Sequence, residues 1–111
     1  MTPTPFQICT THSEGTAFVA IRGELDLATC PELEAVLAQQ ASADHRVVLD
    51  LSELRFIDSS GIRVLLMASR RAQREGSELG LIRGQEPVMR TLALCGATDE
   101  LPFIGSDAAA L

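Results

Sequence analysis

The chain has 111 residues, a length that indicates one domain with a core of modest size. Its 15 acidic and 9 basic residues give a net charge of −6, and this acidic balance argues against non-specific binding to nucleic acid or to an anionic membrane surface. No apolar run approaches the length of about 20 residues that a membrane-spanning helix requires, so we expect no direct insertion into a membrane.

The first elements predicted in chain order are two strands that form a β-hairpin. Residues 1–5 lack the basic and apolar regions of a signal peptide and are expected to be a loose end. Residues 6–11 and 16–22 read as strands, and the Glu14-Gly15 pair between them suits a turn.

A helix over residues 29–41 is predicted next, after Gly23 ends the second strand. Thr29 and Glu32 match a capping box, and Pro31 suits a first turn. Apolar side chains repeat at helical spacing and are expected to face the core, namely Leu33, Val36, Leu37 and Ala41. A loop over residues 42–45 follows.

The middle of the chain predicts a buried strand, a turn and a second helix. Residues 46–51 are apolar enough to be covered on both faces, which suits a central strand. Residues 60–75 place apolar side chains on one side and arginines on the others, so we expect a helix there. Gly76 stands where a C-cap glycine belongs.

The last predicted elements are a strand over residues 79–83, a helix over 87–95, a short strand over 101–104 and a loose tail over 105–111. Strands that alternate with helices favour crossovers and parallel pairing. The sequence therefore predicts an α/β fold, one domain over residues 1–111 with a mixed, mostly parallel sheet in the order β-β-α-β-α-β-α-β. Four side chains should be buried in it: Val48, Leu49, Leu65 and Leu81.

The segment Asp58-Ser59-Ser60-Gly61 stands at the predicted turn from a strand into a helix. The first N–H groups of a helix point outward there and favour negative charge. Asp58 or Ser59 could be the N-cap, with Gly61 allowing close packing in the first turn. Alternatively, a hydroxyl at this place could carry a phosphate, which the helix end would tolerate.

Residues that catalysis or metal binding would need are sparse. His12 and His45 are the only histidines, and Ser59 does not lie in a G-x-S-x-G segment. Glycine-rich phosphate-binding loops are absent as well. We therefore expect no enzyme, no metal site and no cofactor. Three widely spaced cysteines should be reduced, mostly buried thiols of a cytoplasmic protein, namely Cys9, Cys30 and Cys95.

Two segments resemble the STAS family, the sulfate-transporter and anti-sigma-factor-antagonist domains. Residues 48–52 (VLDLS) and 56–61 (FIDSSG) are similar to the family's strand–loop–helix signature. Residues 23–26 (GELD) are similar to its acidic turn before the first helix. Length and element order fit as well, so the resemblance covers nearly the whole chain.

In the antagonist branch the first serine after the aspartate is phosphorylated, and that position here is Ser59. The resemblance implies that an unphosphorylated antagonist binds an anti-sigma factor, which is also an ATP- and Mg²⁺-dependent serine kinase, and frees the sigma factor. Phosphorylation would end the complex, and a serine phosphatase would reset the protein. The resemblance also implies that Asp26 and Asp58 lie near Ser59 on the partner-facing surface. We predict that this surface continues along the exposed side of the second helix, with the partner-binding residues Asp26, Asp58, Ser59, Ser60, Gly61 and Arg63.

The free-standing STAS subunits of lipid-transport ABC complexes are of similar length and give the alternative interpretation. Such a subunit would be a constitutive adaptor on a membrane transporter. A serine at position 59 favours the antagonist, because the hydroxyl can accept a phosphate. The Ser59-Ser60 pair leaves open which hydroxyl is modified.

Overall fold

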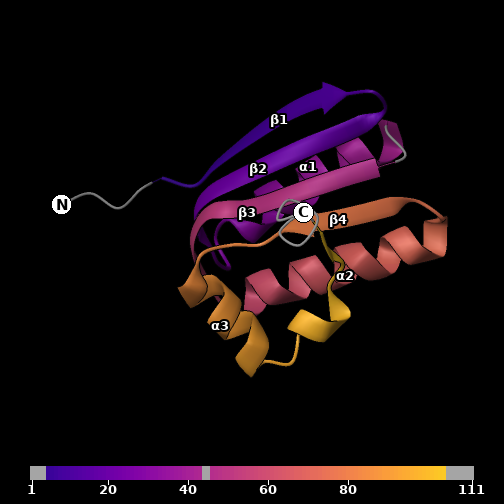
Figure 1. Ribbon diagram of the computed structural model, residues 1–111. Coiled ribbons are helices and arrows are strands. Elements are labelled where there is room, and N and C mark those ends of the chain that lie inside the picture. Colours follow the sequence, from indigo (N-terminus) through magenta and orange to yellow (C-terminus); the bar gives the residue numbers. More distant parts are fainter. Residues whose placement is uncertain (1–4, 44–45, 105–111) are drawn as a thin grey trace, which may run out of the picture.

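The computed structural model describes residues 5–43 and 46–104, which form one mixed α/β domain. Its sheet has the order β1-β2-β3-β4-β5, with β1 antiparallel to β2 and every other neighbouring pair parallel (Figure 1). The predicted fold class and element order are therefore confirmed. The strands are β1 (Gln7–Ser13), β2 (Thr16–Leu25), β3 (Arg46–Ile57), β4 (Glu78–Ile82) and β5 (Phe103–Ile104).

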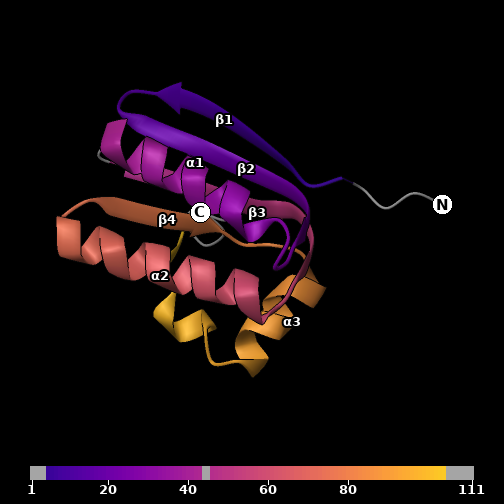
Figure 2. The same cartoon turned by 180° about the vertical axis from the view of Figure 1, so that it is seen from behind.

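Helices connect the parallel strands and leave part of the sheet open. Figures 1 and 2 show α1 (Cys30–Ala43) and α2 (Ser59–Glu75) side by side on one face of the sheet. The third helix, α3 (Glu86–Leu94), packs beside β3 beyond the end of β4, and a 3₁₀ turn, η1 (Thr98–Glu100), leads to β5. Each helix lies within two residues of its predicted range. The expected loose ends fall outside the described residues, apart from Pro5.

The core lies between the sheet and the two helices that cover it. Alternate residues of β2 are buried, as the two-residue period of a strand requires, and they belong to the same apolar core as Leu65 and Ile62 of α2. All four side chains predicted to be buried are so: Val48, Leu49, Leu65 and Leu81. Gly76 ends α2 in the left-handed conformation with φ +71°, and Gly15 adopts φ +80° in the hairpin turn.

The strands β2 and β3 are longer than predicted. Gly23 does not end β2, which continues to Leu25, and β3 continues past residue 51 to Ile57. Two register shifts give β3 extra residues against β2, one opposite Ile21 and one between the positions paired with Gly23 and Glu24. The apolar residues Leu51, Leu54 and Ile57 are consequently buried at a spacing of three, which is not the pattern of a regular strand.

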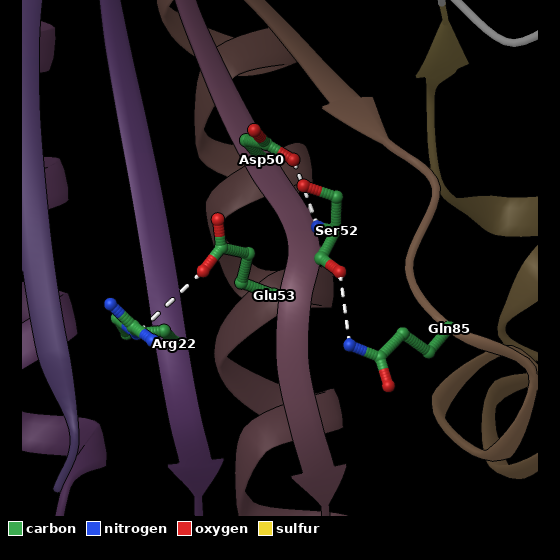
Figure 3. A network of polar contacts seen from close by, with 5 residues as sticks. All are labelled: Arg22, Asp50, Ser52, Glu53 and Gln85. Carbon is green, nitrogen blue, oxygen red and sulfur yellow. Dashed lines mark hydrogen bonds and ion pairs between the residues drawn. The ribbon is translucent and has the colours of Figure 1, made fainter. Parts of the chain in front are cut away.

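Figure 3 shows the polar contacts that hold the first of these bulges. The Ser52 N–H donates to Oδ1 of Asp50 at 2.8 Å, and Nε2 of Gln85 donates to the Ser52 carbonyl at 3.2 Å. Arg22 on β2 faces Glu53 with 3.7 Å between nitrogen and oxygen. Because Gln85 directly precedes α3, this contact joins the start of α3 to the central strand.

The cysteine prediction was only partly right. All three thiols are free, but Cys30 alone is buried, whereas Cys9 and Cys95 are exposed. Cys95 was expected to end the third helix, over residues 87–95, as a mostly buried thiol. The helix ends at Leu94, and the chain then turns through Gly96 with φ +72°, which leaves the Cys95 side chain facing solvent.

Candidate functional site

The ends of β2 and β3 bring two carboxylates to one end of the sheet. Leu25 and Ile57 are paired in register, and the Asp58 N–H donates to the Leu25 carbonyl at 3.2 Å. Asp26 and Asp58 are the next residues on the two strands, and both are half-buried. Two motifs 32 positions apart in sequence therefore meet, because adjacent parallel strands end at the same edge.

Asp58 is the N-cap of α2, which decides between the two caps that the sequence left open. Its backbone is extended, and its Oδ1 accepts a hydrogen bond from the Gly61 N–H at 3.1 Å. Ser59 is consequently the first helical residue and is exposed. Its hydroxyl forms no hydrogen bond with residues 5–43 or 46–104, so it has no role in holding the described fold together.

Gly61 has the structural role that the sequence suggested for it. A Cβ at this position would lie 2.7 Å from Cγ1 of Ile57 and 2.9 Å from Cγ of Leu25. The missing side chain lets the first turn of α2 approach the ends of both strands. Gly61 is buried, so it shapes the surface from below, while Ser60 beside it is half-buried.

Asp26 organises the turn between β2 and α1. Its Oδ1 accepts from the backbone N–H of Ala28 at 3.0 Å and of Thr29 at 3.1 Å. The predicted capping box of Thr29 and Glu32 is wrong. Thr29 directly precedes α1, but its hydroxyl accepts from the Asp26 N–H at 2.9 Å and donates to the Glu24 carbonyl at 2.9 Å, so it makes no capping contact with Glu32.

Cys30 lies beneath this acidic end of the sheet, a neighbourhood that sequence reasoning missed. Burial raises the pKa of the Cys30 thiol, and the carboxylates of Asp58, Glu34 and Asp26 raise it further. The only feature of the sequence that could have indicated this neighbourhood is the position of Cys30 directly after the turn that begins at Asp26. The thiol is neutral at physiological pH and adds no charge to the site.

Two exposed apolar side chains at this end of the sheet were also missed. Leu27 follows Asp26 and is 76% exposed, and Phe56 precedes Asp58 by two residues and is 46% exposed. An apolar side chain inside an acidic turn was the signal that could have found Leu27. Exposed apolar groups beside half-buried carboxylates are typical of a protein-binding surface.

Arg63 lies one helical turn beyond Ser59 on α2 and is exposed, as predicted. It forms no ion pair with any residue of 5–43 or 46–104. Arg70 and Arg71 on the same helix differ, since they pair with Glu100 at 3.3 Å and Glu75 at 3.1 Å. Arg63 therefore provides an exposed positive charge without an ion pair in the described residues, one helical turn beyond Ser59.

The described residues offer little for other kinds of site. Within 5–43 and 46–104 no three acidic, histidine or cysteine side chains are grouped to hold a metal ion. In the same part of the chain no helix has the length and apolar character to cross a membrane. His12 contacts Gln40 at 2.7 Å, and His45 lies outside the described residues.

Comparison with known proteins identifies the family. A family model described as "Mlab, STAS domain" matches residues 9–104. The chain belongs to the STAS domain family. An anti-sigma F factor antagonist from Paenibacillus polymyxa is 31% identical over 108 residues, which span 95% of this STAS domain and 92% of that protein. This similarity favours the antagonist branch of the family.

Solved structures share the fold. An anti-sigma factor antagonist from Mycobacterium paratuberculosis matches with a TM-score of 0.81 at 24% identity, over 96% of this STAS domain and 92% of that chain. The Bacillus cell fate determinant SpoIIAA, solved in its phosphorylated form, matches with a TM-score of 0.67 at 18% identity, over 96% of both chains. The architecture in Figure 1 is thus the STAS fold.

Proposed function

We propose that this STAS domain is an anti-sigma factor antagonist that phosphorylation at Ser59 switches off. The proposal rests on the different roles of two neighbouring residues at the start of α2. Asp58 caps the helix, and the Ser59 hydroxyl is exposed without a hydrogen bond to the described residues. A kinase can therefore reach the hydroxyl without opening the fold. The similarity to the Paenibacillus polymyxa antagonist supports the same proposal.

The proposed cycle has four steps, and in each of them the protein is a binding partner or a substrate. The unphosphorylated form binds an anti-sigma factor that is also a serine kinase, and the sigma factor is released. The kinase uses ATP and Mg²⁺ to transfer the γ-phosphoryl group to the Ser59 oxygen, which loses its proton, and ADP leaves. The complex separates, and a serine phosphatase hydrolyses the phosphate. The protein needs no cofactor of its own and acts in the cytoplasm, where its partners are.

Electrostatics explains why the phosphate would disrupt binding and not folding. The group adds a charge of about −1.5 to −2 beside the Asp58 carboxylate and near Asp26. The positive end of α2 offsets part of that charge within the domain. A partner surface that fits the two carboxylates and the exposed side chains of Leu27 and Phe56 then meets a third, larger anion. The cost falls on the complex through repulsion and lost fit.

The alternative is a constitutive adaptor subunit of a lipid-type ABC transporter. The description of the matching family model, "Mlab, STAS domain", does not name anti-sigma factor antagonists, so this match alone does not select between the two functions. An adaptor would bind its transporter with an affinity that is indifferent to the chemistry of Ser59. The two functions therefore separate on the response of binding to changes at this one residue.

The deciding experiment combines intact mass with binding titrations. We expect the candidate kinase and ATP to add one phosphate to the wild type and to the Ser60→Ala variant, but none to Ser59→Ala. In titrations against the anti-sigma factor, Ser59→Ala should bind like the wild type. Ser59→Asp should bind poorly because it places a second carboxylate beside Asp58. Equal affinity for all variants, with no phosphate on the wild type, would favour the adaptor.

A further inference from the structure

Ser59 and Arg63 occupy the first and fifth positions of α2, so their side chains lie on the same side of the helix one turn apart. Both residues are exposed. Neither side chain pairs with another residue in the described part of the chain. An arginine without an ion pair in the described residues thus lies four residues after a hydroxyl that can become a phosphate, at a spacing that allows the two groups to meet.

The same domain contains an acidic version of this arrangement in α3. Glu86 is the first residue of that helix and Arg90 the fifth, and Oε1 of Glu86 lies 2.6 Å from Nη2 of Arg90. The acid precedes the arginine, which is the favourable orientation along a helix. An anion at the first position of a helix in this domain can therefore pair with an arginine four residues later.

We propose that the phosphate on Ser59 forms an intramolecular ion pair with Arg63. The inference rests on the proposed function, because it describes the phosphorylated form of the same site. A phosphate oxygen reaches beyond the serine oxygen, much as the Glu86 carboxylate does, and arginine suits phosphate through paired N–H donors. Asp58 lies next to the phosphate and Asp26 lies nearby, and both repel it. Arg63 is the cation that offsets them.

The ion pair gives the modification a second effect on binding. In the unphosphorylated form Arg63 is available to a carboxylate of a partner. After phosphorylation the same guanidinium is held by the phosphate of its own helix. The modification thus adds negative charge to the surface and also withdraws its unpaired positive charge. A partner that uses both signs of charge loses two contacts through one covalent change.

The test uses protein with phosphoserine installed at position 59 during translation, so that it needs neither the kinase nor the partner. Phosphorus NMR follows the second ionisation of the phosphate from pH 5 to 8 at low ionic strength. Three proteins are compared: the phosphorylated wild type, phosphorylated Arg63→Gln and phosphorylated Arg74→Gln. Arg74 is the matched control, because it is an exposed arginine of α2 located in its last turn.

We expect Arg63→Gln to raise the midpoint of the phosphate titration by about 0.3 pH unit, since an exposed pair at this spacing is weak but measurable. Arg74→Gln should leave the midpoint unchanged, and about 1 M salt should remove the difference. The helix dipole and both aspartates are common to all three proteins, so the difference reports on Arg63. Coincident midpoints for wild type and Arg63→Gln, or an equal shift in the control, would overturn the ion pair.

These outcomes are separate from those that test the proposed function. Failure of a kinase to modify Ser59 removes the switch but leaves the installed phosphate and its titration measurable. Coincident midpoints remove the ion pair and leave the phosphorylation cycle as it is.

Discussion

Asp58 and Ser59 are adjacent, yet removing each side chain should have a different effect on stability. Asp58→Ala deletes the acceptor for the Gly61 N–H and should lower the free energy of unfolding by about 0.5–2 kcal/mol. Ser59→Ala deletes a hydroxyl that has no bond in the described structure, so its effect should stay within about 0.5 kcal/mol. Urea denaturation of both variants measures the difference. An equal loss in the two would mean that Ser59 shares the cap.

Cys30 should make the domain less stable at high pH. Its pKa is raised in the fold by burial and then by neighbouring acids, so the unfolded chain releases the thiol proton first. The stabilisation is fully present below the ordinary thiol pKa and is lost as pH rises through the folded pKa. Denaturation at pH 8 and pH 10 should show a larger loss in the wild type than in Cys30→Ala.

That comparison is clean because the chain has neither tyrosine nor lysine to titrate in the same range. The exposed thiols of Cys9 and Cys95 are common to both proteins. A pH dependence identical in wild type and Cys30→Ala would show that the thiol is not the source.

Sequence reasoning named the candidate site residues but did not assign the separate structural roles of Asp58 and Ser59. Aspartate and serine are both common N-caps, so composition alone could not choose between Asp58 and Ser59. The choice depends on the Asp58 N–H, which pairs with the Leu25 carbonyl and fixes where the strand stops. Such a contact between distant segments leaves no local mark in the sequence. The capping box predicted at Thr29 failed for a local reason, because the Thr29 hydroxyl accepts from the Asp26 N–H and donates to the Glu24 carbonyl.

Helix α2 offers a matched pair of core and surface substitutions. Leu65 is 0% exposed, whereas Met67 on the same helix is 48% exposed. Leu65→Ala should cost about 2–5 kcal/mol through lost burial and the cavity left behind. Met67→Ala should cost much less, because its side chain is half in water in the folded state. Thermal and urea denaturation test both variants, and a loss below about 0.5 kcal/mol for Leu65→Ala would contradict the packing.

The helices were predicted more accurately than the two long strands, and the reason is periodicity. Each helix keeps a regular apolar stripe and has a glycine or proline near an end. The second half of β3 has no such regularity, since its bulges bury Leu51, Leu54 and Ile57 at intervals of three. A bulge is stabilised in part by the neighbouring strand and by contacts such as that of Gln85 with Ser52, which are not local in sequence.

The domain as a whole should bind its partner through one end of the sheet. Asp26→Asn keeps an oxygen that can accept the Ala28 and Thr29 N–H bonds but removes the charge. We expect it to weaken binding of the anti-sigma factor at least several-fold with little change in melting temperature. Arg63→Glu should do the same through repulsion.

Leu94→Ala on α3 is the control for these two variants. Leu94 is 82% exposed, so its loss should change neither stability nor binding if the surface is where we propose. Calorimetric titration and thermal denaturation of all three variants provide the comparison. Weakened binding by Leu94→Ala, with Asp26→Asn unaffected, would move the docking surface to the third helix.

The cap of α2 by Asp58 also has a consequence for how long each form of the protein persists in a cell. A phosphate on Ser59 leaves the hydrogen bonds of the described fold intact, so both forms should unfold to a similar extent. Proteases that cleave the transiently unfolded chain would then remove them at similar rates. Degradation would not erase or bias the signal. The signal would then be the ratio of phosphorylated to unphosphorylated protein, and synthesis would set only the total amount of the protein.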